Sequence, residues 1–327
     1  MNAGTKGGGK VFTTIAISVI LILWLIPTIG LLVTSFRPVS LINTTGWWTV
    51  FYVNNGPEIN KSEGTYLQQL GNRLTIDNYI DALTGYRGTT TYRKDCNDGS
   101  KPLGYKCDIS DLLNPRGMGR AFLNSVVVTI PATILPILFA AFAAYAFAWF
   151  DFRGRYVLFA ILVGLQVVPL QMTLVPVLRM YSALGLNGTF LAVWLFHTGF
   201  GLPYAIYLLR NFMGGLPREL FESAYLDGAT HWTTFTKLVL PLTMPAVASL
   251  GIFQFLWVWN DLLVSLVFLG GTKPVMTYQI SNMVTSMGAG WHLLTAAAFL
   301  SMIVPMIVFF SLQKYFVRGM MAGAVKG

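Results

Sequence analysis

The sequence predicts an all-α integral membrane protein with six membrane-spanning helices. Of its 327 residues, 54% are hydrophobic and only 11% are charged, whereas a soluble domain carries about 25% charged residues. The apolar residues also gather in repeated stretches of about 20, the length that an α-helix needs to cross a bilayer core about 30 Å thick. These two observations exclude a soluble globular enzyme and predict helices in contact with membrane lipid.

The first apolar stretch, 11–36, holds no charged residue and lies between Lys10 and Arg37. Because no small-residue cleavage site follows a short apolar core, we expect residues 1–36 to be a tail and a retained helix and not a signal peptide. Prolines inside such stretches are tolerated as kinks in lipid. Five further stretches are predicted to span the membrane, at 121–150, 156–178, 188–209, 246–269 and 293–312.

Residues 37–118 form a long polar segment after the first helix, which we expect to be an extracytoplasmic insertion. Both cysteines of the chain, Cys96 and Cys107, fall in this insertion. If it lies on the oxidising side, a disulfide closing a small loop is the favoured arrangement. Two unpaired thiols remain the alternative.

Residues 119–327 are predicted to form a core of five spans, with a cytoplasmic loop at 210–245 and a cytoplasmic tail. Ten cations lie in the segments that are inside if the N-terminus is inside, whereas the two short outer loops hold only Arg179 and Lys273. This asymmetry predicts that both termini are cytoplasmic.

Two ionisable residues lie within predicted spans, His197 in the fourth and Asp261 in the fifth. Burial of such groups in lipid is costly, which makes them functional candidates; a hydrogen bond between packed helices is the alternative. Asp261, Trp257 and Asn260 are candidates for lining a substrate path. Gln166 in the third span is a further candidate, since its amide can reach a sugar hydroxyl.

No catalytic constellation, zinc-type spacing or other metal site is visible in the sequence, so we expect no enzyme activity. Gly4 to Lys10 follow the spacing of a phosphate-binding loop, but Val11 stands where Ser or Thr is needed and no strand precedes it. We therefore expect this chain to bind no cofactor. Its net charge of +9 is scattered in short clusters, which gives no indication of nucleic-acid binding.

A short helix is predicted inside the cytoplasmic loop, from Arg218 to Gly228, with Pro217 at its first position. Gly214 and Gly215 interrupt the preceding span. An isolated helix of this length is marginal in water, so it must dock on something.

This loop resembles the Glu-Ala-Ala loop of the membrane subunits of ATP-binding-cassette importers. It reads Glu222-Ser223-Ala224, then Asp227-Gly228-Ala229, and later Leu240-Pro241; Ser223 replaces the usual first Ala, a small-for-small change. The rest of the chain except about 39–118 is similar to the maltose-type second permease of the sugar-transporting branch. The stretches that carry this similarity are Ser35 to Pro38, Asn124-Ser125, Ala144 to Ala146, Phe152 to Arg155, Leu184 to Thr189 and the tail from Gly319 to Gly327.

The resemblance implies a type I importer permease in a bacterial or archaeal cytoplasmic membrane, moving an oligosaccharide or glycoside. Its expected partners are a second permease, a dimer of ATPase subunits that holds ATP and Mg, and an extracytoplasmic solute-binding protein. The helix with Glu222 would be a coupling helix in a groove of the ATPase, and Gly323, Lys326 and Gly327 in the tail would form a second contact. The alternatives are an amphipathic helix lying on the membrane and, for the whole chain, an ion- or proton-coupled secondary transporter using Asp261 and His197.

Overall fold

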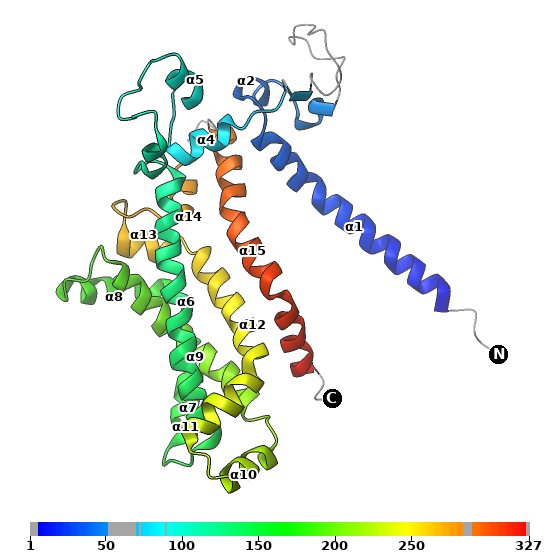
Figure 1. The fold of residues 1–327 in the computed structure, drawn as a ribbon, viewed down its shortest axis with the longest axis vertical. Helices are drawn as coiled ribbons and strands as arrows, with labels where there is room; N and C mark the ends of the chain where they lie inside the picture. Colours follow the sequence, from blue (N-terminus) through cyan, green and yellow to red (C-terminus); the bar gives the residue numbers. More distant parts are fainter. Residues whose placement is uncertain (1–5, 52–69, 72, 89, 284–289, 325–327) are drawn as a thin grey trace. The chain divides into compact units, whose positions relative to one another are not determined.

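The computed structural model describes residues 6–51, 70–71, 73–88, 90–283 and 290–324, and every regular element among these residues is a helix. Five helical segments are long and apolar enough to cross a membrane, and one bent pair of helices supplies up to a sixth. The all-α membrane fold predicted from the sequence is therefore confirmed (Figure 1). The chain divides into two compact units, Met1–Gly119 with Ile280–Leu300, and Arg120–Gln279 with Ser301–Gly327; residues 1–5, with Gly4, lie outside the described part.

The first unit contains helix α1 (Lys6–Ser35) and the described part of the insertion. That part consists of α2 (Val39–Ile42), η1 (Trp47–Phe51), α4 (Asp77–Thr84), α5 (Tyr92–Asn97) and η2 (Ile109–Leu113). The last carbonyls of a helix lack partners within the helix. The side-chain amide of Asn78 on α4 donates to the carbonyl of Ser35, the last residue of α1 (2.9 Å), and to that of Arg37, two residues further on (2.8 Å). The insertion is thereby fastened to the end of α1.

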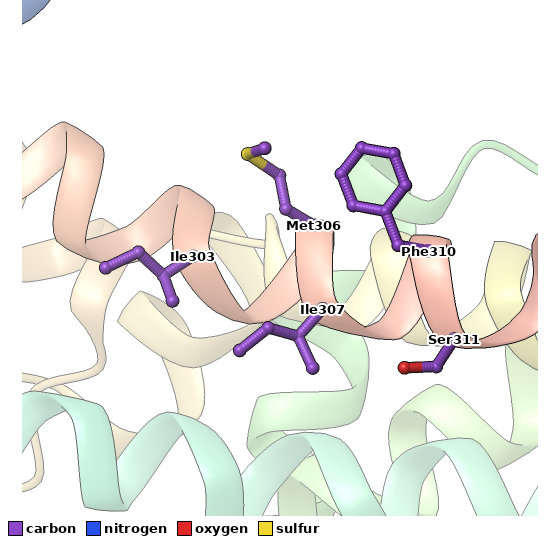
Figure 2. Close-up of a pocket in the computed structure, with 5 residues that line it drawn as sticks. All are labelled: Ile303, Met306, Ile307, Phe310 and Ser311. Atoms are coloured by element: carbon purple, nitrogen blue, oxygen red, sulfur yellow. The ribbon is translucent and has the colours of Figure 1, made fainter.

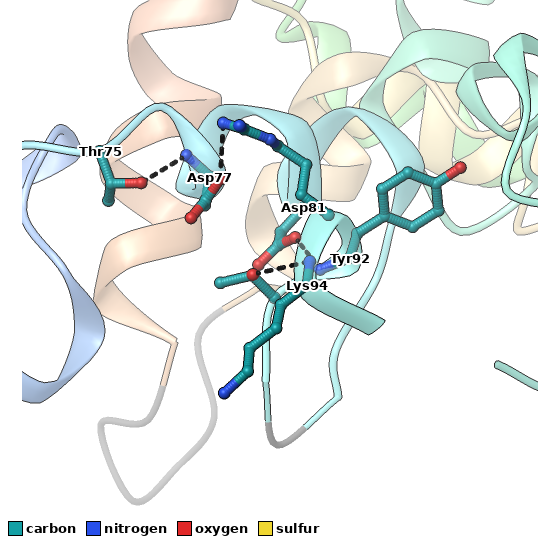
Figure 3. A network of polar contacts seen from close by, with 7 residues as sticks. Thr75, Asp77, Asp81, Tyr92 and Lys94 are labelled. Atoms are coloured by element: carbon teal, nitrogen blue, oxygen red, sulfur yellow. Dashed lines mark hydrogen bonds and ion pairs between the residues drawn. The ribbon is translucent and has the colours of Figure 1, made fainter. Parts of the chain in front are cut away.

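The segment from α4 to η2 is held together by polar contacts, a disulfide and packed aromatic rings. Cys96 and Cys107 form a disulfide, and the rings of Tyr86, Tyr92 and Tyr105 pack edge to face. Figure 3 shows the carboxylate of Asp81 accepting a hydrogen bond from the backbone N–H of Tyr92 (2.8 Å). Burial is the main reason that the pKa of Asp81 rises from its ordinary value to about 7.

The second unit is a bundle arranged around α9 (Phe190–Met213), which packs against α12 (Leu240–Trp259) and α13 (Leu263–Leu269). One apolar cluster lies toward the C-terminal end of α9 and includes Ala144 of α6 (Met118–Trp149), Leu209 and Val239. A second cluster lies toward its N-terminal end and includes Val193, Val264 and Phe268. The other elements of this unit are α7 (Arg155–Leu165), α8 (Leu170–Ala183), α10 (Arg218–Leu226), α11 (His231–Thr234) and the π-helical turn η3 (Phe235–Val239). Helices α14 (Met276–Ser281) and α15 (Trp291–Ala324) each belong to both units.

The third predicted span, 156–178, is not one straight helix. Helix α7 (Arg155–Leu165) and helix α8 (Leu170–Ala183) meet at an angle of 100°. Pro169 lies at the break, immediately before α8, and a proline disfavours helical backbone in the residue before it. Hydropathy alone does not register this bend because both halves are apolar.

The fifth predicted span, 246–269, is also displaced. The helical run that includes α12 begins at His231 and ends at Trp259, and α13 is a separate helix. The carboxylate of Asp261 accepts hydrogen bonds from the backbone N–H groups of Val264 (3.4 Å) and Ser265 (3.1 Å). This capping begins a new helix where the sequence predicts one continuous span. The predicted cytoplasmic loop 210–245 is also too long, because the helical run begins at His231.

Candidate functional site

Helix α10 is fastened to the ends of two long helices by one aromatic side chain. Phe221 is only 3% exposed, and its ring stacks on that of Trp149, the last residue of α6, with centroids 3.5 Å apart. The indole N–H of Trp149 donates to the carbonyl of Met213, the last residue of α9 (3.1 Å). Pro217 precedes the helix instead of being its first residue.

The C-terminal end of α10 explains why the motif contains a glycine. Gly228 has a φ of +79°, a left-handed conformation that favours glycine. Its N–H bonds the carbonyl of Tyr225 (3.0 Å), and the N–H of Ala229 bonds the carbonyl of Ala224 (2.9 Å). This pair of bonds is the Schellman arrangement, which satisfies the last carbonyls of a helix. The chain can therefore end α10 sharply and begin the next helix at His231.

The face of α10 that points away from Phe221 is exposed and is not covered by other described residues. Glu222, Ser223, Asp227 and Gly228 are exposed, and Ala224 and Ala229 are half-buried. Leu226 is 89% exposed, and Glu222 makes no ion pair with the described residues. The sequence-predicted residues therefore lie together on α10 and in the turn that follows it, and they present a carboxylate, small residues and the apolar side chain of Leu226.

The predicted tail contact is described only in part. Helix α15 continues to Ala324, so Gly323 is helical. Lys326 and Gly327 lie outside the described residues.

Two of the four candidate path residues line cavities beside α9. Trp257 lines one cavity of about 380 Å³ together with Phe200, Tyr204 and Gln254. Gln166, at the break between α7 and α8, lines a second of about 360 Å³ that shares Phe200 and Tyr204 with the first. The two cavities therefore adjoin and present aromatic faces and amides.

Asp261 and Asn260 do not line these two cavities. The Asp261 carboxylate caps α13, and the side-chain amide of Asn260 donates to the carbonyl of Leu256 one turn earlier (2.8 Å). His197 is fully buried, with its Nε2 3.8 Å from a carboxylate oxygen of Asp261 and its ring edge-on to Trp257. His197 and Asp261 thus lie against each other at the junction of α9, α12 and α13.

A third cavity, of about 510 Å³, is unrelated to these candidates. Figure 2 shows that its five lining side chains all come from α15. Four of them are exposed and apolar, namely Ile303, Met306, Ile307 and Phe310. This is a groove along one helix face, and it has the chemistry of a surface that meets lipid or another helix. No group of three His, Cys, Asp or Glu side chains in the described part of the chain is placed to hold a metal ion.

Sequence reasoning did not identify the residues that hold the site in place. Phe221 occupies an apolar position of a short amphipathic pattern, which indicates burial but not its contact with Trp149. Phe200 and Tyr204 recur at i and i+4 in a span that is apolar on all sides, so periodicity gives no signal for them.

The fold and the exposed α10 loop define a multi-span membrane protein of the permease class. The family model for the binding-protein-dependent transport system inner membrane component matches residues 124–322. The osmoprotective compounds uptake permease protein GgtD of Synechocystis sp. is 49% identical over 327 residues, covering 99% of this chain and 95% of that protein. The alpha-glucoside transport system permease protein AglG of Rhizobium meliloti is 42% identical over 365 aligned residues, covering 96% of each chain.

The chain belongs to this family of inner membrane components of binding-protein-dependent transport systems. Its fold is also similar to a chain in the crystal structure of a bacterial ABC transporter involved in the import of the acidic polysaccharide alginate. The TM-score is 0.64 and the coverage is 97% of this chain and 99% of the other. At 16% sequence identity that likeness concerns the fold alone.

Proposed function

We propose that this chain is the permease subunit of an ATP-driven, binding-protein-dependent importer of an oligosaccharide or glycoside. The observation that carries the proposal is the α10 loop, in which Phe221 anchors a helix to the bundle, Gly228 closes it, and Glu222 faces outward. Its partners are a second permease, a dimer of ATPase subunits carrying ATP and Mg, and an extracytoplasmic solute-binding protein.

In this proposal α10 is a coupling helix that docks in a groove of the ATPase. The Glu222 carboxylate pairs with an arginine there, since charge-assisted bonds of that kind are strong and directional. Closure of the ATPase dimer pulls α10, and the attached spans alternate between inward-facing and outward-facing states. Gly323, Lys326 and Gly327 form a second contact with the ATPase, and both chain termini are cytoplasmic, with the insertion on the outer side.

The carbohydrate assignment is supported by the names of relatives and by the cavities beside α9. Besides the alpha-glucoside permease, the melibiose/raffinose/stachyose import permease protein MelC of Bacillus subtilis is 30% identical over 245 residues. Binding sites for small molecules combine apolar and aromatic walls with a few polar groups that fix orientation. Trp257 and Tyr204 supply aromatic walls, and the amide of Gln166 supplies a polar group.

A secondary transporter using Asp261 and His197 is disfavoured. The Asp261 carboxylate already accepts two backbone hydrogen bonds at the start of α13. The family to which the chain belongs depends on binding proteins, a component that a secondary transporter does not need.

The test is purification of the tagged chain from its native membrane in mild detergent, followed by mass spectrometry. We expect a Walker-motif ATPase and a second permease to accompany the wild-type chain, and Glu222→Lys to lose the ATPase while remaining folded. The matched control is Asp98→Lys, which reverses an exposed carboxylate that, like Glu222, makes no ion pair with the described residues and that lies outside the α10 loop. Retention of the ATPase by Glu222→Lys would exclude the coupling role, and a wild-type chain purified alone would exclude the importer.

A further inference from the structure

A chain of side-chain contacts joins α10 to α6 through the first residue of α11. The hydroxyl of Tyr225 on α10 lies 3.1 Å from Nδ1 of His231. The hydroxyl of Tyr145 on α6 lies 3.5 Å from the same nitrogen and donates to the His231 backbone carbonyl (3.4 Å). A neutral imidazole with its proton on Nε2 leaves Nδ1 free to accept a hydrogen bond from the Tyr225 hydroxyl, while the single proton of the Tyr145 hydroxyl is donated to the His231 carbonyl.

His231 is held by ring contacts as well as by hydrogen bonds. Its imidazole lies edge-on to Phe150, just after α6, with centroids 4.7 Å apart, and edge-on to the ring of Tyr225 at 5.5 Å. It is also the first residue of the helical run that continues through η3 and α12 to Trp259. A displacement of His231 is therefore a displacement of the start of a membrane span.

We propose that His231, with Tyr225 and Tyr145, is the positioning element that transmits movement of the coupling helix to α6 and to the span that begins at His231. This inference rests on the proposed function, because it needs an ATPase that moves α10. The element is separate from the attachment of α10, which depends on the Phe221–Trp149 stack. Loss of the Tyr225–His231 bond leaves α10 docked but no longer fixed to the start of the next span.

Tyr225 and His231 can be substituted without disturbing the packing of the bundle. Tyr225 and His231 are both exposed, so neither Tyr225→Phe nor His231→Leu leaves a buried cavity. His231→Asn is the conservative variant, since its amide can place a hydrogen-bonding atom near the position of Nδ1. Tyr207→Phe is the matched control for removing a hydroxyl, because the Tyr207 ring stacks on Phe159 and its hydroxyl has no hydrogen bond to the described residues.

The experiment uses the complex purified with its ATPase and reconstituted in liposomes. A single cysteine is introduced at Phe253, which lines the cavity with Trp257; the native cysteines are joined in a disulfide. The labelling rate of this cysteine by a membrane-impermeant maleimide is measured without nucleotide and with ATP plus vanadate, beside the rate of ATP hydrolysis. The first readout follows the membrane spans, and the second follows the ATPase.

We expect Tyr225→Phe and His231→Leu to co-purify with the ATPase and to hydrolyse ATP within about twofold of the wild-type rate. The ATP-dependent change in labelling should fall about fivefold, the factor that corresponds to one neutral hydrogen bond. His231→Asn should recover most of it, and Tyr207→Phe should not alter it. A full labelling response in Tyr225→Phe and His231→Leu would overturn the inference while leaving the proposed function in place. Absence of an ATPase from the wild-type complex would overturn both.

Discussion

Replacement of Gly228 by alanine tests whether the left-handed end of α10 is required for coupling. The φ of Gly228 is +79°, and a residue with a Cβ atom in this conformation costs about 1–2 kcal/mol. A Cβ built at Gly228 meets no atom within 4 Å. The whole cost is therefore conformational, with no contribution from a steric clash.

This cost should appear in the affinity for the ATPase. If docking requires the closed end of α10, 1–2 kcal/mol corresponds to a loss of about 5–30-fold in the binding constant. The assay is a titration of the purified permease complex with the ATPase that accompanies it. Gly228→Asn should lose less affinity than Gly228→Ala, because asparagine enters the left-handed region more readily.

The control for Gly228→Ala is Gly164→Ala in α7. Gly164 also has open space around a built Cβ, but it lies inside a regular helix, where alanine is favoured over glycine. We expect this variant to keep its affinity for the ATPase. Wild-type affinity in Gly228→Ala would refute the argument from backbone conformation, and equal losses for Ala and Asn would attribute the effect to side-chain size instead.

Two further predictions concern the insertion. The disulfide joins residues 11 apart in the sequence, and cross-links that close loops of this size contribute about 3 kcal/mol to the free energy of unfolding. The double variant Cys96→Ser, Cys107→Ser should therefore be cleaved faster by a protease between α5 and η2. An unchanged cleavage rate would contradict this. Burial raises the pKa of Asp81 to about 7, so the folded state keeps this proton at pH values where the unfolded state has released it. The stability of the insertion should fall by up to roughly 4 kcal/mol as the pH rises from about 4 to 7. Asp81→Asn should flatten that decline in hydrogen-exchange protection, measured on the full chain and corrected for intrinsic exchange, and an equally steep decline in the variant would exclude Asp81 as its source.

The membrane helices could be predicted because a span is a property of composition over about 20 residues. Their ends could not be predicted in the same way. The sequence predicts Asp261 as a residue of a substrate path, and the structure adds that its carboxylate accepts two backbone hydrogen bonds at the start of α13. A carboxylate can accept hydrogen bonds from a helix end or from a ligand, and the sequence alone does not indicate that a helix begins just after Asp261.

The α10 motif was visible in the sequence because its residues are contiguous. Its supports were not visible, since Phe221 meets Trp149 and Tyr225 meets His231 and Tyr145 only after the chain has folded. Tyr145 and His231 are 86 residues apart, and nothing in the sequence indicates that these two side chains meet. Motif recognition therefore finds the surface that meets a partner, while the contacts behind that surface depend on tertiary structure.

The division of α10 into a held face and an exposed face has a mechanical consequence. The held face contains one buried aromatic ring and a hydrogen-bonded chain to His231, whereas the other face leaves Glu222 and Leu226 without partners among the described residues. If both faces of α10 were packed against this chain, no partner could bind it and move it. If neither face were attached, a partner could move α10 without displacing the membrane spans. Helix α10 is attached to α6 and to the helical run that begins at His231, and its other face is open to a partner. In this arrangement a partner that pulls on α10 also displaces membrane helices.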